Sequence, residues 1–312
     1  MDDYFRKMPK AELHLHLEGS LEPETLRELD PALSGREIRS RYSYGGFQDF
    51  IESYKWVLGL LRGPDEYALA ARRLLDRLAM ENVVYAEVTL SAGAVLWQGK
   101  EFAPIFEAVA REAERSSVEV SLILDAVRHF GVDHAMAAAR LAADRAGGGV
   151  VAFGIGGDET RGPAERFAPV FRFVRERGLR VTVHAGEAAG PESVWAAVRA
   201  GADRIGHGVA AARDPGLLRR LGEDNIPIEV CLSSNVATGA VPKLAAHPLR
   251  LFLEHGVPVV LNTDDPAMFQ TTLLREYEIA AGEFSLTRAE LEGIVRNGFR
   301  YAFQPMKSTG GQ

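Results

Sequence analysis

The sequence predicts a (β/α)8 TIM barrel, and three observations lead to this fold class. Short runs of apolar and β-branched residues recur along the chain, most of them separated by amphipathic stretches of helical period. The runs are apolar on both faces, as strands are in a parallel sheet that helices cover. Eight such units in about 250 residues match the size of this barrel. An open doubly wound sheet is the alternative, but the Gly-rich phosphate turn that it usually carries after its first strand is missing here.

The predicted strands follow one another along the whole chain. They cover residues 11–17, 83–90, 119–126, 150–157, 180–187, 203–208, 227–235 and 257–265. We find no interdomain linker, internal repeat or low-complexity tract, so residues 1–305 are predicted to form a single domain, followed by a tail at 306–312.

The gap between the first two predicted strands is too long for one crossover helix. It contains an aromatic-rich helical pattern over residues 47–61, and a second helix is expected after Pro64. We therefore predict a helical insertion at about 20–82, placed at the barrel mouth as a lid that excludes water and packs on a ligand. Simple packing of these helices against the barrel is the alternative.

Composition limits the function classes. The chain is 46% hydrophobic and 25% charged, which is typical of a globular protein, and its net charge of −7 gives no basic surface for nucleic acid or anionic membranes. The start of the sequence lacks a secretory pattern and no apolar run is long enough to span a bilayer, so we expect a cytoplasmic protein without a membrane partner, possibly a homo-oligomer. A single cysteine, Cys231, excludes an internal disulfide and a multi-thiolate zinc site, so a metal would need histidine and carboxylate ligands.

The first predicted strand carries two histidines, in the stretch AELHLHLEGS at residues 11–20. Residues two apart in a strand share a face, so His14 and His16 can converge on one ion while the leucines between them face the other way. Two core histidines held by hydrogen bonds are the alternative for any isolated pair of this kind.

The rest of the chain favours the site over the core pair. Chemistry in this barrel takes place at the carboxyl ends of the strands, and six of the predicted strands end in polar residues. These residues are His16 and Glu18; Gly157, Asp158 and Glu159; His184 and Glu187; His207; Ser233, Ser234 and Asn235; and Asp264 and Asp265. So many polar groups directed at one mouth indicate an active site.

Three imidazoles and one carboxylate from the first, fifth and eighth strands can surround one divalent ion. They are His14, His16, His184 and Asp264. Nitrogen and oxygen donors without thiolate suit zinc best, with iron, cobalt or nickel also admissible. The fourth strand has no lysine to bridge a second ion, so we predict one metal.

Two further residues fit hydrolysis at such a metal. Zinc lowers the pKa of a bound water to about 7, which makes hydroxide available at neutral pH. His207 is placed to orient that water or to take its proton, and Glu187 can act as a general acid on the substrate. The alternatives are a fifth metal ligand for His207 and a hydrogen-bond partner of a histidine for Glu187.

Six motifs resemble, in order, those of the adenosine deaminase family: PKAELHLHLEGS, GGDE, VHAGE, RIGHG, CLSSN and NTDDP. The resemblance runs from about Pro9 to Phe303 and implies a mononuclear zinc aminohydrolase that converts a 6-aminopurine to the 6-oxo compound and ammonia. It implies that Glu187 protonates purine N1 while hydroxide attacks C6, and that His207 stabilises the incoming oxygen. It also implies that Asp265 bonds N7 and that the Gly157 backbone meets N3.

One position departs from the family pattern. Typical adenosine deaminases resemble HxHLDG, with an aspartate that reaches the ribose 5′-hydroxyl, whereas this chain has Glu18, which is one methylene longer. A changed reach toward a hydroxyl can change the substrate. Glutamate here resembles the bacterial branches that act on adenine and on 6-amino-6-deoxyfutalosine, an adenosine-like intermediate of menaquinone synthesis.

The flanking segments resemble the aminodeoxyfutalosine branch most, so that compound is our expected substrate and futalosine the product. Adenosine and adenine are the alternatives within the class. The expected substrate carries a benzoate in place of the 5′-hydroxyl, and Lys55, Trp56 and Arg62 are candidates to recognise it. A non-catalytic purine-binding protein is the alternative from another class. Ester or phosphoester hydrolysis is a weaker hypothesis than either, because it would require a second metal or phosphate-binding cations.

Overall fold

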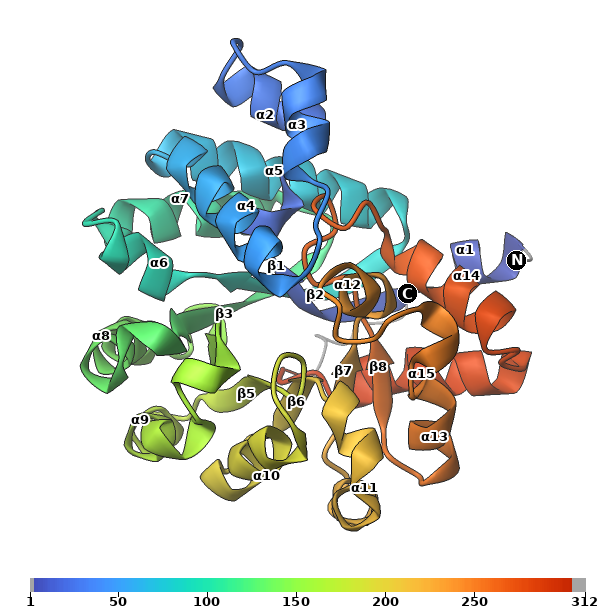
Figure 1. The fold of residues 1–312 in the computed structure, drawn as a ribbon. Coiled ribbons are helices and arrows are strands. Elements are labelled where there is room, and N and C mark those ends of the chain that lie inside the picture. Colours follow the sequence, from blue (N-terminus) through green and yellow to red (C-terminus); the bar gives the residue numbers. More distant parts are fainter. Residues whose placement is uncertain (1–2, 305–312) are drawn as a thin grey trace, which may run out of the picture.

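A computed structural model describes residues 3–304 and contains one eight-stranded sheet in which consecutive strands are parallel neighbours. The strands curve into a nearly closed barrel with helices around it, which confirms the predicted fold class (Figure 1). They are β1 Lys10–His16, β2 Val83–Leu90, β3 Glu119–Val127, β4 Val150–Gly156, β5 Arg180–Ala185, β6 Arg204–His207, β7 Ile228–Val230 and β8 Val259–Leu261. The predicted tail at 306–312 lies outside the described residues.

The barrel closes between its last and first strands just beyond the end of β8. Asp264 forms an isolated parallel bridge with Leu15. The N–H of His16 donates to the Asp264 carbonyl at 2.8 Å, and the Asp264 N–H donates to the His14 carbonyl at 3.0 Å. The backbone that completes the barrel therefore also places Asp264 beside both histidines of β1.

The predicted strands start within two residues of the observed ones, but the last two predictions extend too far. β7 ends at Val230 and β8 at Leu261, whereas the predicted strands reached residues 235 and 265. After β7 the chain turns at Cys231 into helix α12, Leu232–Ala237, which carries Ser233, Ser234 and Asn235. Serine and asparagine side chains compete for backbone hydrogen bonds and favour helix starts and turns over strand continuation.

The helices lie outside the sheet, and most of them connect its strands. They are α1 Asp3–Lys7, α2 Pro23–Leu29, α3 Gly35–Arg41, α4 Phe47–Leu60, α5 Pro64–Met80, α6 Ala92–Trp97, α7 Phe102–Arg115, α8 Val132–Ala143, α9 Ala168–Arg175, α10 Pro191–Ala200, α11 Pro215–Glu223, α12 Leu232–Ala237, α13 Leu249–Glu254, α14 Leu273–Glu283 and α15 Arg288–Arg300. Of these helices, α1 precedes β1, and α14 and α15 follow β8. Within residues 3–304, none of the helices combines the length and apolarity that crossing a membrane requires.

The segment between β1 and β2 divides into two parts. Helix α5 starts at Pro64, a residue whose fixed φ suits the first helical turn, and packs against β2 and α7 as the crossover helix of the first unit. Helices α2 and α3 project from one end of the molecule, and α4 lies across the mouth, where it contacts the short helix η1, Glu18–Ser20 (Figure 1). The predicted helices at 47–61 and after Pro64 are present. Of the helices in this segment, α5 belongs to the barrel layer, whereas α2 to α4 lie outside it.

Candidate active site

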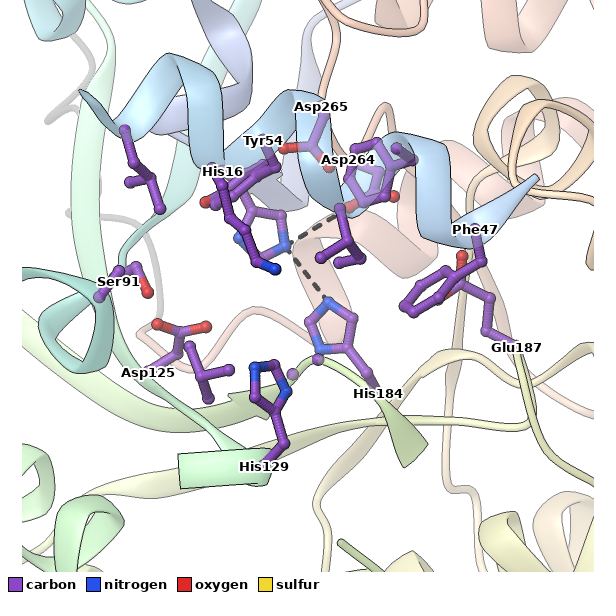
Figure 2. A pocket seen from close by; sticks show the side chains of 18 of the residues that line it. His16, Phe47, Tyr54, Ser91, Asp125, His129, His184, Glu187, Asp264 and Asp265 are labelled. Atoms are coloured by element: carbon purple, nitrogen blue, oxygen red, sulfur yellow. Dashed lines mark hydrogen bonds and ion pairs between the residues drawn. The ribbon is translucent and has the colours of Figure 1, made fainter. Parts of the chain in front are cut away.

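A predominantly apolar pocket lies at the carboxyl ends of the strands (Figure 2). It encloses about 830 Å³ together with its open mouth. Its polar side includes His16, Ser91, Asp125, His129, His184, Glu187, His207, Asp264 and Asp265. Its apolar side includes Phe47, Phe50, Ile51, Leu58, Ala94, Trp97, Val127 and Phe130. A concave apolar site with a few converging polar groups is the usual form of a small-molecule site.

All four residues proposed from sequence as metal ligands lie close together: His16, His184 and Asp264 line this pocket, and His14 Nε2 lies 3.3 Å from Asp264 Oδ1. Ligand atoms of His14, His184, His207 and Asp264 lie within 4.8 Å of one another. His16 joins them: its Nε2 lies 3.2 Å from His184 Nε2 and 3.4 Å from Asp264 Oδ1, contacts that Figure 2 marks with dashed lines. This group of nitrogen and oxygen donors could hold a divalent metal.

Hydrogen bonds behind two of the histidine rings leave their Nε2 atoms for the pocket. His14 Nδ1 lies 2.7 Å from Glu229 Oε2, and His184 Nδ1 lies 3.2 Å from the Ile155 carbonyl. Both partners accept hydrogen bonds, so each ring donates from Nδ1 and, in its neutral form, keeps a lone pair on Nε2. His14 Nε2 is buried without a hydrogen-bond partner. An orphaned ring nitrogen facing carboxylate Asp264 fits a site built for a cation.

A buried ion-pair network supports His14 from below. Arg204 is 1% exposed and donates to Glu229 at 2.5 Å and to Glu87 at 2.6 Å. Although burial alone would raise it, the positive charge of Arg204 and the hydrogen bond from His14 lower the pKa of Glu229 to about 2. Glu229 is therefore an ionised acceptor that fixes the ring orientation of His14.

The backbone at two site residues is strained. His207 and Asp264 have φ of 64° and 66°, in the left-handed region that residues with a side chain rarely adopt. Asp264 is also held by Ser234, whose Oγ donates to its Oδ2 at 2.7 Å. Gly206 allows the close approach of β6 to His14, because a Cβ at 206 would lie 2.9 Å from His14 Cε1.

Glu187 follows β5 on a loop that a second carboxylate holds in place. Glu159 accepts hydrogen bonds from the backbone N–H groups of Gly186, Glu187 and Ala188 at 2.7 to 2.8 Å. The Glu187 side chain reaches the pocket, with Oε2 at 3.6 Å from His207 Nε2. Burial raises the pKa of Glu187, as a group that must hold a proton requires.

The three residues proposed from sequence to bind substrate occupy different positions. Asp265 lines the pocket and its Oδ1 has no hydrogen-bond partner, and Gly157 lines it with φ of 85°. Glu18 is fully buried and does not line the pocket. Its carboxylate accepts from the Ser91 N–H at 3.0 Å and from the Tyr54 hydroxyl at 3.3 Å. Its described contacts thus hold the wall, and direct contact with substrate stays a prediction.

Sequence reasoning missed several residues of the site. Asp125 lies two residues before the end of β3 and lines the pocket with an unpartnered Oδ1, and burial raises its pKa to about 6. A carboxylate near a strand end was a signal that could have found it. The supporting residues Arg204 and Glu229 gave no such signal, because each lies within an ordinary strand pattern.

Arg128 and His129 are adjacent in sequence but have different surroundings. Arg128 is buried and donates to the carbonyls of Gly156, Gly162 and His184, so it joins the ends of β4 and β5. His129 lines the pocket.

Of the three benzoate candidates, only Lys55 lines the pocket. Trp56 packs against Arg41, and Arg62 pairs with Glu66.

Comparisons with known proteins agree with this geometry. A family profile described as adenosine deaminase matches residues 9–310. An adenine deaminase from Rhizobium leguminosarum is 37% identical over 95% of both chains. An aminodeoxyfutalosine deaminase from Streptomyces avermitilis is 36% identical over 97% of this chain and 88% of the relative. An amidohydrolase from Burkholderia ambifaria, solved with bound zinc, superposes with a TM-score of 0.88 at 27% identity, covering 96% and 87% of the two chains.

Proposed function

The chain belongs to the adenosine deaminase family and is a metal-dependent aminohydrolase for an adenine-type substrate, and from this premise we propose that it converts 6-amino-6-deoxyfutalosine to futalosine. That reaction would place it in menaquinone synthesis. Family membership also removes the alternative of a non-catalytic purine-binding protein, since the relatives are named deaminases.

One observation carries the choice of substrate: besides its polar residues, the pocket is lined by several aromatic residues and by a cation, Lys55. Phe47 and Ile51 of α4 belong to this apolar wall, and so do Trp97 and Phe130, whose rings stack at 5.3 Å. Lys55, one helical turn beyond Ile51, lines the same pocket. Adenine would leave this wall uncovered, whereas the benzoate of aminodeoxyfutalosine supplies an aromatic ring for the wall and a carboxylate for the lysine.

Two polar residues of the pocket favour a nucleoside over a free base as the substrate. Asp125 and Ser91 both line the pocket, and Asp125 has an oxygen without a partner. A buried acceptor without a partner loses free energy unless a ligand donates to it. The hydroxyls of a ribose would satisfy Asp125, while adenine carries no group that reaches so far from its ring.

The metal would be held by His14, His16, His184 and Asp264, and a divalent ion there supplies activation of water at neutral pH. Zinc fits the donor set best, and the same nitrogen and oxygen donors also suit iron. The buried Nε2 of His14, which makes no hydrogen bond and lies 3.3 Å from the Asp264 carboxylate, is the observation that fits an ion at this point.

The chain's own residues would perform the proton transfers. Glu187 gives its proton to N1 of the purine, which makes C6 electron-poor, and His207 orients the oxygen that attacks C6. A bond forms between C6 and this oxygen, and the bond between C6 and the amino nitrogen breaks. Of the two protons of the attacking water, one replaces the proton that Glu187 gave to N1 and the other goes to the amino nitrogen, which leaves as ammonia. Burial and the neighbouring Asp264 carboxylate raise the pKa of Asp265, which favours a protonated Asp265 that donates to purine N7. The backbone at Gly157 would meet N3.

The decisive experiment is a comparison of kcat/KM for aminodeoxyfutalosine, adenosine and adenine, followed by the ultraviolet shift from 6-amino to 6-oxo purine. We expect aminodeoxyfutalosine to be preferred. Turnover of adenine that equals or exceeds it would instead assign the chain to the adenine deaminases, to which it is as similar in sequence. Preference for adenosine would refute a benzoate site.

A matched pair of variants tests the wall itself. Trp97 and Met80 are both exposed large apolar residues, but only Trp97 lines the pocket. Trp97→Ala should raise KM for aminodeoxyfutalosine roughly tenfold, the effect expected from losing about 1.4 kcal/mol of aromatic contact. It should leave adenine turnover unchanged, and Met80→Ala should change neither. Equal effects of Trp97→Ala on both substrates would exclude a specificity role for the wall.

A further inference from the structure

A chain of hydrogen bonds behind His207 differs in kind from those behind the other site histidines. It starts at His247, which lies just before α13. His247 is 5% exposed, and the proposed mechanism does not use it. The backbone N–H of Leu249 donates to His247 Nδ1 at 3.1 Å. A backbone N–H can only donate, so His247 Nδ1 carries a lone pair and the neutral ring carries its hydrogen on Nε2. Burial lowers the pKa of His247 to about 3, which keeps the ring neutral.

The hydrogen on His247 fixes the amide of Asn235. His247 Nε2 lies 3.1 Å from Asn235 Oδ1, so the amide oxygen accepts and the amide nitrogen points the other way. That nitrogen lies 3.0 Å from His207 Nδ1. An amide nitrogen can only donate. The Leu249 N–H therefore sets the direction of every hydrogen bond along the chain from His247 through Asn235 to His207.

We propose that Asn235 and His247 are positioning residues that hold His207 as the tautomer with its hydrogen on Nε2, so that this atom donates a hydrogen bond into the pocket. His207 Nε2 lies 3.6 Å from Glu187 Oε2 and 4.0 Å from Asp264 Oδ2, where the attacking oxygen must pass. A ring nitrogen that carries hydrogen has no lone pair for a metal.

The contrast with His14 and His184 explains how neighbouring imidazoles can have different roles. In those two rings Nδ1 faces an acceptor, which is Glu229 for His14 and the Ile155 carbonyl for His184. Their Nε2 atoms are therefore free to bind an ion. A donor stands behind His207 and turns its Nε2 into a donor. The kinetic consequence rests on the proposed function, whereas the tautomer does not depend on a substrate.

Asn235→Asp is the main test, because a carboxylate keeps the shape of the amide but can only accept. It can accept from His247 Nε2 and from His207 Nδ1, which moves the His207 hydrogen to Nδ1. We expect kcat to fall about 100-fold or more, within the range that a positioned proton donor contributes, with KM changed less than about threefold. Nitrogen-15 NMR of the ring nitrogens in the zinc-loaded protein should show the hydrogen of His207 on Nε2 in the parent and on Nδ1 in the variant.

Two further variants keep the test decisive if Asn235→Asp does not fold. His247→Gln retains an amide donor toward Asn235 and should preserve the tautomer and most of kcat, whereas His247→Ala should lose both. Asn297→Asp is the matched control, since Asn297 on α15 donates only to the Val259 carbonyl. It should leave the His207 signals and kcat unchanged.

The outcomes separate this proposal from the proposed function. A parent protein with the hydrogen on His207 Nδ1 would overturn it, as would an Asn235→Asp variant with unchanged NMR signals and kcat. If the parent deaminates none of the three purines and the NMR signals still shift as described, the substrate assignment fails while the positioning role stands.

Discussion

Glu159 and Glu187 are carboxylates of neighbouring loops with different surroundings. Both carboxylate oxygens of Glu159 are occupied by hydrogen bonds, since they accept from three backbone N–H groups and from the Ser193 hydroxyl at 2.5 Å. The Glu187 side chain faces the pocket, and burial raises its pKa. Different environments for two like groups commonly separate a structural carboxylate from a catalytic acid.

Glu187→Gln tests this assignment at a single side chain. The amide keeps the size of the carboxyl but has no acidic proton, so we expect deamination to fall by about two to four orders of magnitude while metal content is unchanged. Steady-state kinetics and metal analysis check both values. Glu165→Gln, at an exposed ion pair with Arg199, is the control and should retain full activity. Near-parental activity of Glu187→Gln would show that another group supplies the proton.

Gly19 gives a second test at the residue scale. A Cβ at position 19 would overlap the Asp265 carboxylate, with Oδ1 only 1.7 Å away, so Gly19→Ala must displace the group proposed to bind N7. We expect kcat/KM to fall at least tenfold. The control is Gly59→Ala in α4, where a Cβ meets nothing within 4 Å and alanine should stabilise the helix slightly. Unchanged kinetics for Gly19→Ala would argue against a role for Asp265.

At the scale of elements, the segments after β7 and β8 do most to complete the site. Helix α12 places Ser234 against Asp264 and Asn235 against His207. The turn before α13 then brings His247 onto Asn235. Packing between these short elements therefore depends on a neutral, buried imidazole at 247.

The titration of His247 predicts how stability changes with pH. Its folded pKa of about 3 lies below the ordinary 6.5, so the unfolded chain binds the extra proton first and the protein loses stability as pH falls below 6.5. Between pH 7 and pH 5 this residue should cost about 2 kcal/mol of unfolding free energy. Denaturant unfolding of the parent and of His247→Gln at the two pH values measures this. The decrease in unfolding free energy from pH 7 to pH 5 should be smaller in the variant by that amount. An equal loss in both proteins would contradict the buried neutral state.

At the scale of the whole molecule, the proposed metal joins the two ends of the sheet. His14 and His16 come from β1 and Asp264 follows β8, and between these strands the described ladder is an isolated bridge. An ion held there would link the first and last strands directly, as well as β5 through His184.

Removal of the metal should therefore affect stability as well as activity. A ligand present at a thousand times its dissociation constant stabilises the folded state by about 4 kcal/mol. We expect chelator treatment to abolish deamination and to lower Tm by several degrees, and added zinc to restore both. Calorimetry and activity on the same samples measure this, and full activity in metal-free protein would refute the proposed site.

The amino-acid sequence by itself determined the barrel, the eight strand positions to within two residues at their starts, and the group His14, His16, His184 and Asp264 that meets near its mouth. It could do so because strand periodicity is local: His14 and His16 share a face through their spacing alone. Only the tertiary structure decided what stands behind each side chain, such as Glu229 behind His14, Asn235 behind His207, and Ser91 and Tyr54 around Glu18. These partners lie 28 to 215 positions apart, and no local pattern records them, because closure of the barrel brings them together.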